Sequence, residues 1–456
     1  MPSLLDIAQR TQTGPKMSEM DWDMAFFRQV TDLAKRYDIR VPAEADWFST
    51  DAGLDERAFQ AGVDLIVEVG MYCITTERVI RFSRDEVLTA IQEAPTRITM
   101  GEGSERTEFR QHQVEGNEPL EVFPGHHAPF STDIGPRVVE SMARVPRTAF
   151  LEGFNFTSVD GREIHGLPME AHATRRQMEY MRAGIRAAAR PGLAIVLYPI
   201  NTRAGALLAA IDPDVGLRRT DGMLLSILPD LKMEHDLLTA VIVGHDYGLF
   251  TLSSSFGLVG GFCGGFDGAI IEGVAKPLGA MLVYGDYINC VGVEDSRGVS
   301  LQSVAFQPTS WARSVVFQAL NGHTHTIGMS LLFAASGPGT ESNLIETAIR
   351  SIEAQINGGN LYVVRHSRAQ MNAGQTPFEA EWAVEVADAT LRAGLDRVAA
   401  GRICRALEER IRGHRPEPGR SITECYDLAH RRPMPEYYDL YLRLKEDLGG
   451  LGLRFA

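Results

Sequence analysis

Short apolar runs alternate with longer amphipathic stretches from about residue 119 onward. Strands followed by helices in this rhythm are typical of βα units, which build parallel sheets. Eight βα units over roughly 250 residues predict a closed (β/α)8 TIM barrel of the α/β class. The eight predicted strands cover residues 119–123, 148–153, 193–198, 223–228, 249–254, 288–293, 327–334 and 361–366.

Two of the intervening helices have especially clear patterns. Met178, Met181, Ile185 and Ala188 fall on one stripe at helical spacing. A second helix is predicted from Glu341 to Asn357, where Gly358-Gly359 ends it. Its predicted inward positions are Leu344, Ile345, Ala348, Ile349, Ile352 and Ile356.

The two ends of the chain lack the βα alternation. Residues 1–118 show helical periodicity and many charges, so we predict an N-terminal helical extension before a barrel domain at 119–394. Residues 395–456 form a predicted C-terminal helical extension, rich in aromatic and leucine side chains near its end. These side chains are expected to pack against the outside of the barrel or against a second subunit.

Composition excludes several classes of partner. The 456 residues carry a formal net charge of −14, whereas nucleic-acid binding needs clustered lysine and arginine. Tyr247–Phe266 is uncharged for twenty residues, but serine and glycine interruptions make it a poor membrane helix. The first residues do not resemble a secretory leader, and five cysteines without CxxC spacing are typical of reduced thiols. We therefore expect a cytoplasmic protein that binds neither nucleic acid nor membrane.

The chemistry of a βα barrel lies at the carboxyl ends of its strands, so candidate residues can be located from the strand positions. The predicted catalytic residues are Asn155, Glu294 and Asp295. The predicted substrate-binding residues are Tyr198, Arg203, Ser254, Phe256, Phe333, Arg365 and His366.

Some of these acidic residues have simpler interpretations. Glu294 and Asp295 can serve as acid and base, or form a loop ion pair with Arg297. Asp230 is followed by Lys232, which favours an ordinary surface salt bridge.

A tightly bound metal is not expected. His126 and His127 are adjacent on an extended segment, so their side chains point to opposite sides, and no third ligand lies at suitable spacing. A zinc site from Cys263, Cys290 and Glu152 is conceivable, but both cysteines are more typical of small buried residues.

The glycine-rich run at residues 257–268 is the least ordinary local feature. It matches neither the P-loop nor the dinucleotide-binding fingerprint, so nucleotide binding is weakly supported. Tight helix packing and a barrel rim kept open for a bulky cofactor are equally good interpretations. The predicted cofactor-binding residues are Gly260, Gly261, Phe262, Gly264 and Gly265.

Several segments resemble the archaeal monomethylamine:corrinoid methyltransferases, in the same order along the chain. They are residues 61–87, 189–196, 229–236, 260–268, 337–341, 424–428 and the C-terminal EYYDLYLRLKEDLGGLGLRF. Each motif has modest specificity, and the shared order and spacing over nearly the whole chain indicate homology.

The resemblance implies a (β/α)8 barrel that moves a methyl group from an amine to the Co(I) of a corrinoid (cobalamin). The corrinoid is carried by a separate partner protein and would cap the barrel, which suits an open glycine-rich rim. The resemblance also implies a homo-oligomer.

This sequence departs from the family at its reactive centre. Family members carry pyrrolysine just after the segment that corresponds to ARPGLAIV, where this sequence has Val196-Leu197-Tyr198. Two glutamates and a glutamine that surround pyrrolysine in the family align with Leu224, Ser254 and Leu331. The imine that captures a neutral amine is therefore expected to be missing, together with the groups that activate the adduct.

A quaternary ammonium or sulfonium substrate carries its own activation as formal charge. Relatives without pyrrolysine in the trimethylamine methyltransferase group use quaternary amines, so analogy favours the same substrate class here. Aromatic faces would hold such a cation, and Arg203 or Arg365 would hold a carboxylate as in a betaine. The acidic net charge also suits a cationic substrate.

Two other functions remain open from the sequence. One is a barrel enzyme of another class, such as a lyase or hydrolase, which would depend on His126, His127 or His366 or on a bound metal. The other is a non-catalytic barrel that binds a small molecule.

Overall fold

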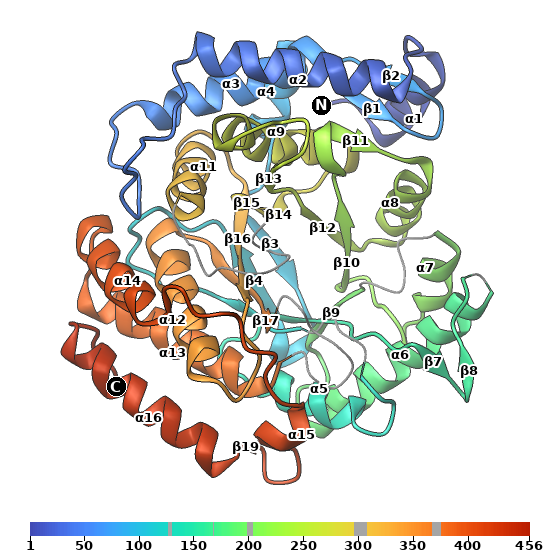
Figure 1. Cartoon of the computed structure of the whole chain (residues 1–456). Helices are drawn as coiled ribbons and strands as arrows, with labels where there is room; N and C mark the ends of the chain where they lie inside the picture. The colour runs from blue at the N-terminus through green and yellow to red at the C-terminus, as the bar shows by residue number, and fades with distance from the viewer. Residues whose placement is uncertain (126–129, 167, 198–203, 296–307, 367–374) are drawn as a thin grey trace.

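Eight parallel strands form the closed barrel that the sequence predicts (Figure 1). The computed structural model describes residues 1–125, 130–166, 168–197, 204–295, 308–366 and 375–456, with backbone alone for 363–366. Neighbours in the barrel follow the order of the chain, and the ring closes where the Ala149 amide donates to the Val122 carbonyl at 3.0 Å. The strands are β5 (Val122–Phe123), β6 (Phe150–Glu152), β9 (Ala194–Leu197), β10 (Gly222–Ser226), β12 (Phe250–Ser254), β14 (Ile288–Cys290), β16 (Ile327–Ala334) and β17 (Asn360–His366).

Helices surround the barrel, one after each strand (Figure 1). They are α5 (Gly135–Ala143), α6 (Met169–Ala187), α7 (Ala204–Ala210), α8 (His235–Tyr247), α9 (Phe266–Tyr284), α11 (Thr309–His323), α12 (Glu341–Asn357) and α13 (Pro377–Ala393). The predicted bounds of α12 are confirmed: the Thr340 hydroxyl caps its first turn, and Gly358 ends it at φ +69°. The six apolar positions predicted to face inward on α12 are all buried, as are Met178, Met181 and Ile185 on α6.

The N-terminal part differs from the all-helical prediction. It contains α1 (Leu4–Thr13), α2 (Glu19–Arg36), α3 (Leu54–Val69) and α4 (Arg84–Glu93), which form a layer beside α9 and α11 (Figure 1). It also contains the short strands β1 (Met71–Cys73), β2 (Arg78–Ile80), β3 (Arg97–Met100) and β4 (Thr107–Arg110). β1 pairs with β11 (Lys232–Met233), which follows β10, so a distant partner rather than a local pattern makes it a strand.

The β3–β4 hairpin closes the amino-terminal end of the barrel. Met100 and Phe109 are fully buried in the interior cluster of the barrel, where the Phe109 ring meets the Phe150 ring edge-on at 5.1 Å. The Gly101 amide donates to the Thr220 carbonyl just before β10, at 3.2 Å. The opposite, carboxyl end of the barrel is therefore the end available to a substrate.

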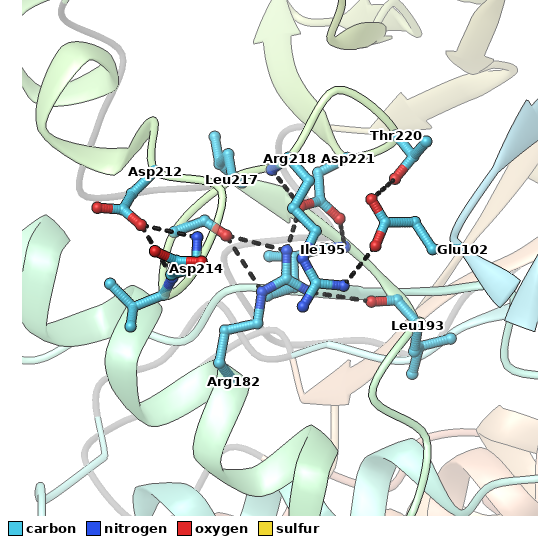
Figure 2. A network of polar contacts seen from close by, with 12 residues as sticks. Glu102, Arg182, Leu193, Ile195, Asp212, Asp214, Leu217, Arg218, Thr220 and Asp221 are labelled. Carbon is cyan, nitrogen blue, oxygen red and sulfur yellow. Dashed lines mark hydrogen bonds and ion pairs between the residues drawn. The ribbon is translucent and has the colours of Figure 1, made fainter.

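A buried ion pair fixes α6 to the amino-terminal end of the barrel (Figure 2). The Arg182 guanidinium binds the Asp221 carboxylate and also donates to the Gly216 and Leu193 carbonyls at 2.9 and 3.2 Å. Asp221 in turn accepts the Ile195 amide at 2.8 Å, which connects β9 to the loop before β10. Both side chains are almost fully buried, and each finds several partners.

The C-terminal part packs on the outside of the barrel, which confirms one of the two predicted alternatives. α14 (Arg397–Ile411), α15 (Ile422–Cys425) and α16 (Pro435–Gly450) lie near α12 and α13 (Figure 1). The Tyr437 hydroxyl donates to the Glu379 carboxylate of α13 at 2.5 Å, and the Trp382 ring stacks on Phe455 with centroids 5.8 Å apart.

Three small elements complete the fold. The strands β7 (Ser158–Val159) and β8 (Arg162–Glu163) form one hairpin, β18 (Tyr426–Asp427) and β19 (Arg432–Pro433) form another, and a 3-10 turn spans Gly103–Glu105. The uncharged stretch 247–266 is divided among α8, two strands and the start of α9. Across the described parts of the chain, no helix is long and apolar enough to cross a membrane.

Candidate active site

The mouth of the barrel, meaning the carboxyl ends of its strands with the loops that follow, contains most of the described candidate residues. Two short parallel strands, β13 (Gly257–Val259) and β15 (Val293–Asp295), extend the sheet beyond β12 and β14. Ser254 ends β12 and pairs with Cys290 of β14, so both lie at the base of the mouth. Phe256 and Phe333 pack against the interior cluster of the barrel.

A small polar group crosses the interior of the barrel at this level. The Tyr362 hydroxyl donates to the Glu152 carboxylate at 3.2 Å, and both residues are buried. Burial raises the pKa of the Cys290 thiol, while hydrogen bonds to Ser254 and Tyr362 oppose that rise. Ser254 therefore belongs to the one polar group described in this part of the interior, with Glu152, Cys290 and Tyr362.

The positions that align with the reactive centre of the family line the same interior. Val196, Leu224 and Leu331 are all buried in the interior cluster of the barrel, and Ser254 lies beside them. Among the described residues, Val196, Leu224 and Leu331 present apolar side chains to the interior and Ser254 presents a hydroxyl. Tyr198, the last residue of the stretch Val196-Leu197-Tyr198 at the predicted pyrrolysine position, lies outside the described residues. The carboxylate of Glu152 lies in the same interior, bonded to Tyr362.

Glu294 has a structural partner that the sequence did not reveal. Its carboxylate accepts the Arg313 guanidinium at 2.5 Å, and Arg313 also binds Glu353 at 2.8 Å. All three side chains are buried, and the Trp47 indole donates to Glu353 at 2.9 Å. This network fastens β15 to α11 and α12. The alternative partner, Arg297, lies outside the described residues.

Asp295 and Asn155 follow barrel strands that are not neighbours, β14 and β6. Asp295 ends β15 and is half-buried. Asn155 follows β6, and its backbone carbonyl accepts the Phe130 amide at 2.9 Å. The Asn155 Oδ1 atom is buried and has no hydrogen-bond partner among the residues that the structure describes, which is an uncommon state for an amide oxygen. A catalytic role for either residue stays a prediction.

Several candidates lie outside the part of the chain that the structure describes. These are Tyr198, Arg203, His126 and His127. For Arg365 and His366 the backbone alone is described, in β17, where they pair with Phe333 and Ala334. Their predicted roles in substrate binding stay predictions.

The two cysteines proposed for a zinc site are separated. Cys290 lies near Glu152, whereas the Cys263 thiol donates to the Leu258 carbonyl at 2.9 Å in the glycine-rich segment. Within the described ranges, no group of three or more His, Cys, Asp or Glu residues is arranged to hold a metal ion.

The glycine-rich segment serves packing at its ends and leaves space in its middle. A Cβ at Gly257 or Gly268 would meet a carbonyl oxygen at 1.9 or 2.0 Å, so tight packing requires glycine there. At Gly265 a Cβ would meet no heavy atom within 4 Å, and at Gly261 the nearest is Asp230 Oδ1 at 3.7 Å. Both residues are exposed, as is Gly260.

The far part of this segment faces α2 rather than the mouth. A Cβ placed on Gly264 would lie 3.8 Å from the Phe27 ring. Together with Gly265 it lines a cavity of about 280 Å³ beside α2. Phe262 is half-buried and packs against the main core. Of the predicted cofactor-binding residues, Gly260 and Gly261 lie nearest to the mouth.

The predicted surface salt bridge between Asp230 and Lys232 is wrong. Lys232 pairs instead with Glu19 and Asp23 of α2, at 2.8 and 2.7 Å. Asp230 is buried and belongs to the 3-10 turn η2 (Pro229–Leu231), where its φ of +61° is left-handed. Lys232 pairs with α2 rather than with Asp230 because α2 covers this edge of the barrel. The sequence pattern alone does not show that α2 lies there.

Two further charged residues were not predicted. Glu272 and Lys276 lie four residues apart on α9, a helix whose residues from Gly268 to Tyr284 are all buried. Glu272 accepts the backbone amides of Asp230 and Leu258 at 2.9 and 3.0 Å, so it holds the loops that follow β10 and β12. Two charges within the otherwise uncharged stretch from Gly268 to Tyr284 were the available signal, because buried charges are retained for specific contacts.

Lys276 and Asp230 have unusual electrostatics. The Lys276 ammonium lies 5.7 Å from the centroid of the Phe256 ring, and burial lowers its pKa. Burial, reinforced by the nearby Glu272 charge, raises the pKa of Asp230 to about 6. Strongly perturbed groups of this kind concentrate at functional sites.

Comparison with known proteins places this chain in a family. Monomethylamine methyltransferase MtmB2 of Methanosarcina acetivorans is 26% identical over 458 residues, covering 99% of this chain and 98% of the relative. MtmB of Methanosarcina mazei is 24% identical over 457 residues with the same coverage. The crystal structure of Methanosarcina barkeri MtmB shares the fold, with a TM-score of 0.91 at 24% identity over 99% of this chain and 98% of that one. The family model described as monomethylamine methyltransferase MtmB matches residues 3–453, and the chain therefore belongs to that family.

Proposed function

We propose that this protein is a corrinoid-dependent methyltransferase without pyrrolysine. Its methyl donor is a small quaternary ammonium or otherwise activated methyl compound. Its methyl acceptor is the Co(I) of a corrinoid carried by a separate partner protein. The relatives are named for monomethylamine, and this chain is proposed to use a different methylated cation.

The proposal rests on the side chains at the positions that align with the reactive centre of the family, which are uncharged in the described part of the chain. Val196, Leu224 and Leu331 are apolar and buried, and Ser254 is the single polar member. Among the described residues, these four positions offer no electrophile to a neutral amine and no carboxylate of their own to activate an adduct. They suit a substrate that is already activated and needs mainly to be positioned.

The leaving group supports the same conclusion. When a methyl group passes to Co(I), its bond to nitrogen breaks and the electron pair of that bond stays on nitrogen. A quaternary ammonium then departs as a neutral tertiary amine, without a proton transfer. A primary amine would need an enzymatic acid or covalent activation at the same step.

The rim of the mouth has space for the partner's corrinoid. Gly260 and Gly261 are exposed, and a Cβ on Gly261 would come no closer than 3.7 Å to its nearest neighbours, Asp230 Oδ1 and the Leu258 carbonyl oxygen. A flat group as large as a corrinoid needs such a low rim to approach the substrate. Gly260 and Gly261, and beyond them Phe262, Gly264 and Gly265, are the proposed contacts.

The test is methyl transfer in a defined mixture. The enzyme is combined with a Co(I) corrinoid protein and, separately, with monomethylamine, trimethylamine, tetramethylammonium, choline and glycine betaine, while the absorbance of the corrinoid is followed. We expect conversion with at least one quaternary compound and none with monomethylamine. Conversion with monomethylamine alone, or with none of the five, would contradict the proposal.

The oligomeric state is a separate expectation. We propose a homo-oligomer, because α16 keeps Tyr438, Leu442 and Leu451 more than 40% exposed along the outside of the molecule. Light scattering coupled to size-exclusion chromatography measures the mass directly. A mass equal to one chain of 50.2 kDa at micromolar concentration would contradict it.

A further inference from the structure

Two buried charges at the mouth have no hydrogen-bond or salt-bridge partner among the described residues. Asp230 is 6% exposed and Lys276 is 3% exposed. Within the described residues, the Asp230 carboxylate and the Lys276 ammonium take part in no hydrogen bond or ion pair, with each other or with any neighbour. The ammonium lies over the Phe256 ring, 5.7 Å from its centroid, and interacts electrostatically with Glu272 and Asp230.

The neighbouring charges show how unusual this is. Glu272, one helical turn before Lys276, uses both carboxylate oxygens to accept backbone amides. Lys232, two residues after Asp230, pairs with two carboxylates. An unpaired buried charge is costly, so a protein that keeps two of opposite sign side by side needs a reason. Neither packing nor the hydrogen bonds of the fold supplies one.

The backbone holds Asp230 in place despite its strained conformation. Its amide donates to Glu272, and its carbonyl accepts the Trp22 indole at 2.9 Å. The left-handed φ of +61° is therefore fixed from both sides. Strain maintained in this way is concentrated at functional sites.

Both charges lie close to residues that the proposed function assigns to the substrate or the corrinoid. Asp230 follows β10 at the mouth, and its Oδ1 atom is the nearest atom to the position of a Cβ at exposed Gly261. Lys276 reaches from α9 to Phe256, which follows β12 and packs against the interior of the barrel. Phe256 is itself a proposed substrate contact.

We propose that Asp230 and Lys276 form a zwitterion-binding subsite for a substrate that carries a methylated ammonium and an anionic group on one small molecule. The inference rests on the proposed function and specifies its substrate class as betaine-like. A quaternary ammonium cannot donate hydrogen bonds, so a carboxylate and an aromatic face attract it as a diffuse charge. A substrate carboxylate accepts hydrogen bonds from the lysine ammonium.

The subsite explains why the two charges form no hydrogen bond with each other. A zwitterion neutralises both at once, whereas a simple cation neutralises Asp230 alone. It also gives Lys276 the anion-binding role that the sequence assigned to Arg203 or Arg365.

Calorimetric titration of the enzyme without any corrinoid protein tests the subsite directly. The probes are glycine betaine and tetramethylammonium, which share the cation and differ in the carboxylate. The variants are Lys276→Met, which keeps the length of the side chain without its charge, and Asp230→Asn. Lys16→Met is the matched control, because it removes the charge of an exposed lysine that lies between α1 and α2.

We expect wild-type enzyme to bind glycine betaine at least tenfold more tightly than tetramethylammonium. Lys276→Met should abolish that preference while leaving tetramethylammonium binding unchanged, and Asp230→Asn should weaken both probes. The Tm of Lys276→Met should rise, because an uncompensated buried charge is removed. A residue with a purely structural role would lower Tm instead.

Other outcomes overturn either the subsite alone or both the subsite and the proposed function. Equal binding of the two probes by wild-type enzyme, or unchanged betaine binding by Lys276→Met, overturns the subsite and leaves the proposed function intact. Methyl transfer from a quaternary amine that lacks any anionic group, at the same efficiency as from betaine, also overturns the subsite and leaves the proposed function intact. Failure of wild-type enzyme to bind either probe, with monomethylamine the sole methyl donor, overturns both proposals.

Discussion

The carboxyl group of Asp230 makes stability depend on pH in a direction opposite to that of most acidic residues. Its pKa is raised to about 6 in the folded chain, from an ordinary value of 3.8. Below pH 4 the group is protonated in both the folded and the unfolded chain and contributes nothing. Between pH 4 and pH 6 the unfolded chain ionises first, so stability falls as pH rises, by up to about 3 kcal/mol.

Asp230→Asn should therefore be stabilising above pH 6, and the gain should vanish towards pH 4. Asparagine has the same shape as aspartate and tolerates a left-handed backbone, so the change removes the charge with little strain. Urea denaturation of the variant and the wild type at several pH values measures the gain. A gain that is constant from pH 4 to pH 8 would contradict the raised pKa.

At the residue scale, the sequence located side chains at the ends of the barrel strands, but it did not reveal which residues those side chains contact. Ser254 and Phe256 lie at the end of β12, where the sequence located them, and their roles in substrate binding stay predictions. Glu294 was located in the same way, but its partner Arg313 lies 19 residues away on α11. Lys276 was missed because it reaches the mouth from a helix rather than from a strand end.

At the element scale, all eight barrel strands were predictable because each is a buried run between amphipathic helices. The strands of the N-terminal part were not predictable in the same way. β1 has three residues and pairs with β11 more than 150 positions later, so no local periodicity marks it. Short strands of this kind are defined by the partner they meet.

The ion pair between α6 and the barrel (Figure 2) should be strongly stabilising only as a pair. Arg182→Met is expected to cost about 3–5 kcal/mol, because it leaves the buried Asp221 charge uncompensated. Adding Asp221→Asn should recover part of that loss. Chemical denaturation in a double-mutant cycle measures the coupling.

Arg186→Met, on an exposed position of the same helix, is the control and should change stability little. Additive effects of the two changes at Arg182 and Asp221 would show that the pair is not coupled.

The β3–β4 hairpin should matter for stability and not for substrate binding. Phe109→Ala removes a fully buried ring that packs on Phe150, which is expected to cost about 3–5 kcal/mol. The hairpin closes the amino-terminal end of the barrel, so affinity for a ligand at the mouth should be unchanged. Urea denaturation and calorimetric titration with glycine betaine separate the two effects, and weaker binding by the folded variant would contradict this placement.

At the scale of the whole molecule, the three predicted segments share one core. A single cluster of buried apolar side chains runs from Ile7 to Leu453. The interior of the barrel is itself completed by Met100 and Phe109, which precede residue 119. The segments 1–118, 119–394 and 395–456 are therefore useful descriptions of the sequence, and they should not fold separately.

A chain restricted to residues 119–394 is expected to lack a cooperative unfolding transition. It would expose the interior that the hairpin covers, and it would leave Glu379 without the Tyr437 hydroxyl. Differential scanning calorimetry of the fragment and the full chain tests this. A sharp heat-absorption peak from the fragment would show that the barrel is an independent domain.

The β3–β4 hairpin is synthesised long before the last barrel strand that it contacts. The carbonyl of Arg110 accepts a hydrogen bond from Asn360, at the start of the last strand and 250 residues later. At a ribosomal rate of about 5–20 residues per second, that interval lasts on the order of tens of seconds. During that time Met100 and Phe109 have no finished barrel to cover. Newly made chains should therefore depend on a chaperone that shields the first quarter of the protein until the last strand emerges.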